Sequence, residues 1–111
     1  MRNLGHTGIR SNLRPLAAQI MERLPEGYGK LVDQFRRATI AISLNIAQGS
    51  GKSTESQKHH CYAIARGEAM ECAAILDILE CMHLLDSKNS KEAKELLENV
   101  VAILSSICKK R

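Results

Sequence analysis

One short segment, NIAQGSGKSTESQ at residues 45–57, separates two long helical patterns and so decides the fold. Its Gly49 and Gly51 end the first pattern, because glycine is a poor helix former and readily adopts the positive φ of a tight corner. Thr54 and Gln57 then have the spacing of a capping box, which begins a second helix. We therefore expect two consecutive helices joined at this corner.

Apolar residues recur at helical spacing on both sides of the corner and near both ends of the chain. They predict four helices, over about residues 13–24, 30–48 and 54–85, and from the turn at 86–90 to about residue 107. Four helices with short connections favour an all-α fold, a single-domain antiparallel up-down-up-down four-helix bundle. We expect residues 1–10 to be a flexible N-terminal arm and residues 11–111 to form the bundle.

The composition limits what this bundle can do. Of the 111 residues 44% are hydrophobic but only 3% aromatic, so the core must be aliphatic and a surface for stacking bases is excluded. No apolar run is long enough to cross a membrane, and four cysteines without a disulfide pattern favour a cytoplasmic protein. The net charge of +4 is unevenly placed, because residues 1–66 are basic and residues 67–108 are acidic.

The two middle helices have more apolar residues than one bundle core needs. Ile40 and Leu44 form a second stripe on the helix over residues 30–48, about 180° from its first stripe. The helix after the corner also has an apolar arc too wide for one neighbour. We interpret this second surface as a homo-oligomer interface. The alternative is extra burial by the first helix or the N-terminal arm.

Two carboxylates, Glu68 and Glu71, lie within that wide apolar arc. If the two middle helices are antiparallel, Arg36 and Arg37 fall near the level of Glu68. Desolvated carboxylates need partners, and guanidinium groups suit them best. We expect Arg36 or Arg37 to bridge to Glu68 or Glu71, within or between subunits. The alternative is that these are solvated surface charges.

Three motifs resemble those of the 23S rRNA intervening-sequence protein family of four-helix bundles. They are QFRRA at residues 34–38, NIAQGSGK at 45–52 and AIARG at 63–67 followed by Glu71. The resemblance marks Asn45, Gly49, Gly51, Arg66 and Gly67 as structural or interface residues, together with the charged residues above. Gln48 and Glu68 depart from the family pattern, which usually has Glu and Ser at these positions.

This resemblance implies a small bacterial four-helix bundle that assembles as a homo-oligomer. A pentameric ring is the form associated with related bundles, including accessory proteins of diversity-generating retroelements, which bind nucleic acid and a reverse transcriptase. The resemblance brings no catalytic residue, and the role of the family itself is poorly defined.

Basic residues are the only nucleic-acid signal, and those we regard as candidates are Arg10, Arg14, Lys52, Lys58, Lys109, Lys110 and Arg111. The segment Gly51-Lys52-Ser53 lacks the rest of a phosphate-binding loop, although the following helix start could hold a phosphate. Neither HHC at residues 59–61 nor CMH at 81–83 has zinc-ligand spacing, so we expect no metal, cofactor or enzyme activity.

We therefore expect a non-enzymatic, homo-oligomeric scaffold with RNA or another nucleic acid as its candidate partner. The alternative is an adaptor that binds a partner protein and has no nucleic-acid role.

Overall fold

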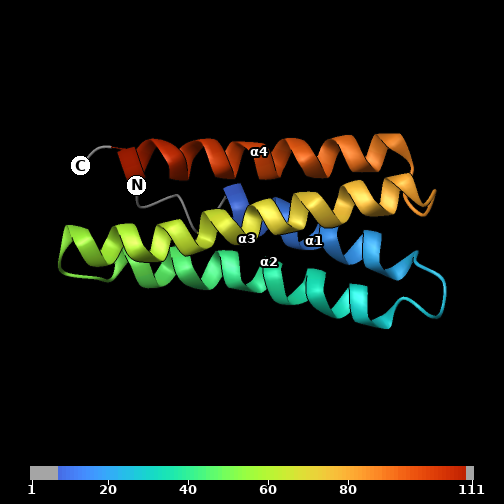
Figure 1. Cartoon of the computed structure of the whole chain (residues 1–111), viewed down its shortest axis with the longest axis horizontal. Coiled ribbons are helices and arrows are strands. Elements are labelled where there is room, and N and C mark those ends of the chain that lie inside the picture. Colours follow the sequence, from blue (N-terminus) through green and yellow to red (C-terminus); the bar gives the residue numbers. More distant parts are fainter. Residues whose placement is uncertain (1–7, 110–111) are drawn as a thin grey trace.

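The computed structural model of the protein describes the backbone of residues 8–109 and the side chains of residues 15–108. Within this span the chain folds into four helices and forms no strand (Figure 1). They are α1 (Gly8–Glu22), α2 (Gly29–Ser50), α3 (Glu55–Cys81) and α4 (Ser87–Lys109). The all-α fold predicted from the sequence is confirmed. The expected arm overlaps α1 at residues 8–10, and its residues 1–7 lie outside the described part.

The four helices form the corners of one bundle. Each runs antiparallel to the helix before it, and contacts join α1 to α2, α2 to α3, α3 to α4 and α4 back to α1 (Figure 1). Over the described residues, no Cα atom of α1 lies within 8 Å of one in α3, and none of α2 within 8 Å of one in α4. The bundle is 44 Å long and 22 by 21 Å across, so its cross-section is close to square.

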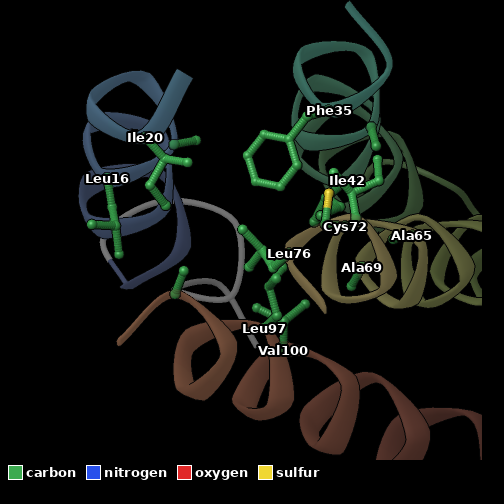
Figure 2. Packing of buried hydrophobic residues seen from close by; sticks show 14 of the residues in the cluster. Leu16, Ile20, Phe35, Ile42, Ala65, Ala69, Cys72, Leu76, Leu97 and Val100 are labelled. Atoms are coloured by element: carbon green, nitrogen blue, oxygen red, sulfur yellow. The ribbon is translucent and has the colours of Figure 1, made fainter. Parts of the chain in front are cut away.

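The core consists of the aliphatic stripes that the helical spacing predicted. Figure 2 shows Phe35 and Ile42 of α2 directed towards Cys72 and Leu76 of α3. The buried side chains follow helical spacing on every helix and include Ile20, Ala38, Ile46, Ala65, Ala69, Leu79, Ala93, Leu97, Val100 and Leu104. Burial of each large aliphatic side chain stabilises the fold by about 1.5–3 kcal/mol.

Polar side chains cap the N-terminal ends of α3 and α4. The side chain of Thr54 accepts a hydrogen bond of 3.2 Å from the Gln57 backbone N–H, as the capping-box spacing predicted. Asp86 accepts bonds from the backbone and the side chain of Asn89, which hold the pKa of its carboxyl below its usual value. The cluster at residues 86–90 is therefore the predicted turn and N-cap.

The end of α3 differs from the prediction, because the helix stops at Cys81 and not near Leu85. His83 adopts φ +59°, the left-handed conformation that usually belongs to glycine at a helix end. Its N–H donates to Glu80 O at 3.0 Å, and Leu84 N–H donates to Leu79 O at 2.9 Å. These two bonds close a Schellman motif, which ends the helix although the apolar pattern continues.

Candidate interaction surface

A three-residue ion cluster joins α2 to α3 on one outer face of the bundle. Arg37 Nη1 lies 3.2 Å from Glu68 Oε2, and Arg37 Nη2 lies 2.7 Å from Glu71 Oε2. The hydrogen bonds that Arg37 donates to Glu71 and then to Glu68 raise the pKa of Arg37 above its usual value. The predicted bridge is confirmed within one chain, through Arg37. Arg36 instead lines a recess between α1 and α2.

Three exposed apolar side chains lie on the same face as this ion cluster. Ile40 and Leu44 follow Arg37 at helical spacing on α2, and Ile64 precedes Glu68 by one turn of α3. The exposed fractions of Ile40, Leu44 and Ile64 are 47%, 54% and 39%. We call these three residues the α2–α3 patch. The sequence predicted its α2 part, which stays largely exposed, although Ile40 also lines the recess between α1 and α2.

Gly49 allows the end of α2 to approach the start of α3. A β-carbon at Gly49 would stand 2.5 Å from Tyr62 Cε1 and 3.1 Å from Cys61 Cβ. Burial raises the pKa of the Tyr62 phenol, because the ring lies within the core. The expectation that the corner glycines adopt positive φ was wrong. Gly51 has φ −90°, and among the described glycines only Gly27 has positive φ.

Of the other predicted motif residues, Asn45 and Arg66 each donate one hydrogen bond, and Gly67 has no close neighbour. Asn45 Nδ2 donates to Ala41 O at 2.9 Å, one turn earlier in α2. Arg66 Nη1 donates to Ser105 Oγ at 3.3 Å and so links α3 to α4. Gly67 is exposed in the middle of α3, with nothing within 4 Å of an added β-carbon. Asn45 therefore lies on α2, and Arg66 lies on the side of α3 that faces α4.

Two of the candidate basic residues lie at the corner between α2 and α3. Lys52 is exposed there, and Lys58 Nζ lies 3.3 Å from Ser50 O at the end of α2. Lys58 thus interacts with the negative end of the helix dipole. Arg10, Arg14 and Lys109 lie in helices, but their side chains are outside the described part, as are residues 110 and 111 entirely.

His59 contacts the end of α4 at the same corner. Its Nε2 lies 3.0 Å from Ile107 O, and its Nδ1 lies 2.7 Å from Glu55 O. The last described residues of α4 therefore lie beside the start of α3 (Figure 1). We call this end of the bundle, with Lys52, Lys58 and the C-terminal end of α4, the basic end.

The sequence analysis missed a polar cluster and a groove between α3 and α4. Buried Ser90 donates to Glu80 Oε1 at 2.7 Å, and Lys94 pairs with both Glu80 and Asp77. The bond from Ser90, followed by that from Lys94, lowers the pKa of Glu80. Beside this cluster, a mostly apolar recess is lined by Met70, Ala73, Ala74, Asp77, Leu97, Glu98, Val101 and Ala102. We call it the α3–α4 groove.

Neither a metal-binding cluster nor a membrane-spanning helix occurs among the described residues. In the described residues, no three His, Cys, Asp or Glu side chains are grouped closely enough to hold a metal ion. Among the same residues, no helix is both long and apolar enough to cross a membrane. The four cysteines are free thiols; Cys61 and Cys72 are buried, and Cys81 is exposed.

The family model for the 23S rRNA-intervening sequence protein matches residues 12–106. The chain belongs to this family. The match includes all of α2 and α3 and most of α1 and α4, so the whole bundle is the family's fold. No curated protein matches the chain.

In this member of the 23S rRNA-intervening sequence protein family, the residues of the three motifs lie on α2 and α3 and at the contact between them. The first motif supplies Arg37, and the last supplies Ile64 and Glu71, all on the outer face of α2 and α3. The middle motif supplies Gly49, which sets how closely these two helices approach. The three motifs therefore build and support the face that holds the α2–α3 patch.

Proposed function

We propose that this protein is a non-enzymatic scaffold that assembles with copies of itself through the α2–α3 patch. The exposed Ile40, Leu44 and Ile64 carry the proposal, because large apolar side chains gathered on one face typically mark an interaction surface. Their removal from water would favour association by about 25 cal/mol per Å² of apolar area buried. The family resemblance favours a ring of five chains.

The second part of the proposal is that the assembled chains bind RNA or another nucleic acid through the basic end. Lys52 and Lys58 lie there, and the basic run at residues 109–111 follows directly from the end of α4. Lys and Arg side chains bind phosphates with little sequence preference. An oligomer multiplies the charge of +4 per chain, which strengthens attraction to a polyanion.

The proposal places the protein in the cytoplasm. The four free thiols support this location, because cytoplasmic conditions keep cysteines reduced.

Self-assembly is tested by the mass of the protein in solution, measured by light scattering and sedimentation at micromolar concentration. We expect several chains per particle, and a single-chain mass for Leu44→Glu, which places a charge in the exposed patch. The matched control is Ile103→Glu, at another exposed apolar residue of which 42% is accessible. A single-chain mass for the unaltered protein would overturn the assembly proposal.

Nucleic-acid binding is tested separately with a fluorescent structured RNA at several salt concentrations. We expect binding at low salt that weakens steeply as salt rises, because condensed counterions are released on binding. Neutralising Lys52 together with residues 109–111 should weaken it, as should neutralising Arg10 and Arg14. No binding at low salt would discard this part, and stoichiometric capture of one protein partner without nucleic acid would favour the adaptor alternative.

A further inference from the structure

The ring of His59 lies between two backbone carbonyl groups, and each ring nitrogen faces one of them. Nδ1 lies 2.7 Å from Glu55 O, one turn earlier in α3, and Nε2 lies 3.0 Å from Ile107 O in α4. Both distances are within the range of hydrogen bonds. A carbonyl oxygen only accepts hydrogen bonds, so both nitrogens must donate if both bonds are to form. We call these two contacts the His59 bridge.

Only the protonated ring can donate from both nitrogens. A neutral imidazole has one N–H, and the lone pair of its other nitrogen would point at a carbonyl oxygen. The neutral ring therefore forms one bond of the His59 bridge and loses the other, whereas the imidazolium cation forms both. The surroundings of His59 thus favour the charged form through two donated hydrogen bonds.

The acceptor on α4 also favours a cation. Ile107 is two residues from the end of α4 at Lys109, and the last four carbonyls of a helix have no partner within it. These carbonyls form the negative end of the helix dipole, so a positive charge beside them is stabilising. His59 is half-buried at this contact. Its protonated ring therefore caps α4 and joins it to α3 at the same time.

The other charged groups at this end of the bundle act on His59 in opposite directions. Glu55 favours the cation, and it is the only acidic residue in the segments 49–63 and 102–109. Lys58 opposes it, although the ammonium of Lys58 lies 3.3 Å from Ser50 O at the end of α2. The other titratable residues of these segments whose side chains are described are Lys52, His60, Cys61, Tyr62 and Cys108. The side chains of Arg10 and Arg14 on α1 and of Lys109 on α4 lie outside the described part.

We propose that the His59 bridge is a proton-dependent link between the C-terminal end of α4 and the first turns of α3. With the proton bound, both hydrogen bonds form and the last turn of α4 is attached to α3. Histidine side chains change charge between about pH 5 and 8. The link is therefore complete at the acid end of this range, and one of its bonds is lost as the pH rises.

The consequence of this link concerns the basic end. The basic run at residues 109–111 continues from the end of α4 that His59 contacts. The proton on His59 then regulates how firmly the start of this run is attached to the bundle. The inference requires neither self-assembly nor nucleic-acid binding, so it stands or falls separately from the proposed function.

The ring protons of His59 give the first test, by NMR of the full-length protein with ¹⁵N-labelled histidine at pH 6. We expect both ring N–H signals of His59 to be observed, because hydrogen bonds slow the exchange of these protons with water. The exposed neighbour His60 is the internal control, and its ring protons should exchange too fast to be observed. A single observable N–H on His59 would show that only one carbonyl accepts a bond, which would overturn the proposal.

Amide hydrogen exchange in the last two turns of α4 tests the link itself. Protection factors are compared at pH 6 and pH 8, because they remove the intrinsic pH dependence of exchange. We expect the protection of these turns to fall by about fivefold between the two pH values, as a charged hydrogen bond at a helix end is lost. His59→Gln should have the same protection at both, since glutamine does not titrate. The matched control His60→Gln should keep the fall.

Two results would overturn the link. One is equal protection of the end of α4 at pH 6 and pH 8 in the unaltered protein, and the other is an undiminished fall in His59→Gln. Circular dichroism melting curves confirm that both variants are folded. The ring spectrum and the comparison of the two pH values are made on the unaltered protein, so they decide the proposal even where a variant is unstable.

Discussion

Gly49 and Tyr62 are in such close contact that the pair fixes the distance between α2 and α3. A β-carbon at Gly49 would stand 2.5 Å from Tyr62 Cε1 and 2.9 Å from Cδ1, and the ring is only 5% exposed. The ring cannot move into solvent without leaving the core. Glycine at position 49 is therefore required by packing between helices rather than by backbone conformation.

The first prediction concerns this contact. Gly49→Ala should lower the free energy of unfolding by about 1–3 kcal/mol, because the added methyl group overpacks the Tyr62 ring. Urea denaturation measures the loss. Gly51→Ala is the matched control in the same corner, since its β-carbon would meet the nearest backbone oxygen at an ordinary 3.7 Å. Equal effects of the two substitutions would contradict the packing role of Gly49.

The second prediction concerns the ion cluster. In a double-mutant cycle, Arg37→Ala and Glu71→Ala should be coupled, because Arg37 Nη2 lies 2.7 Å from Glu71. The coupling should shrink as salt is added, since all three charged groups are partly exposed. The control cycle pairs Arg36→Ala with Glu71→Ala and should show no coupling within a single chain. Thermal melts in the Leu44→Glu background, which we expect to be a single chain, provide the measurement.

The third prediction concerns the end of α3. His83→Gly should raise the free energy of unfolding by about 0.5–1 kcal/mol, because glycine adopts positive φ without a steric cost. His83→Ala should give no such gain, since alanine keeps the β-carbon. Chemical denaturation compares the two variants with the unaltered protein. A destabilised His83→Gly variant would show that the His83 side chain stabilises the end of α3.

The fourth prediction concerns the buried thiol of Cys72. Burial raises its pKa to about 12, with smaller contributions from Glu71 and Glu68. Well below its ordinary value of 9.0 the thiol is neutral in both states and adds no pH dependence. Between the ordinary value of 9.0 and about 12, the unfolded chain loses this proton while the folded chain keeps it. The free energy of unfolding should therefore fall by up to about 1.4 kcal/mol per pH unit.

The check on Cys72 is the slope of stability against alkaline pH. Cys72→Ala should have a shallower slope than the unaltered protein, whatever its absolute stability. Cys81→Ala should keep the full slope, because Cys81 is exposed. Identical slopes for all three proteins would mean that Cys72 does not titrate differently in the folded and unfolded states.

Features set by neighbouring residues were predictable from the sequence. The spacing of Thr54 and Gln57 predicted the start of α3, and the antiparallel arrangement of two helices placed Arg37 opposite Glu68. Both predictions depend on the 3.6-residue repeat and on one short turn. The α2–α3 patch was anticipated in part for the same reason, because a helix with two opposite apolar stripes cannot bury both in one core.

Features set by the distance between helices were not predictable. The need for Gly49 depends on how closely the Tyr62 ring approaches, which helical spacing does not reveal. The end of α3 was missed because histidine gives no signal for a left-handed conformation, and the apolar pattern continues through Leu84 and Leu85. The α3–α4 groove arises where small side chains such as Ala73 and Ala74 of α3 lie beside α4.

The short length of α1 has a consequence for how the bundle opens. α1 has 15 residues, whereas α2, α3 and α4 have 22, 27 and 23, so it is attached over the shortest length. Stability is rarely uniform across a fold, and the least attached element opens first. Amide hydrogens of α1 should exchange with solvent while those of α2 and α3 stay protected. The α2–α3 patch would then persist in a state in which α1 has already separated from the bundle.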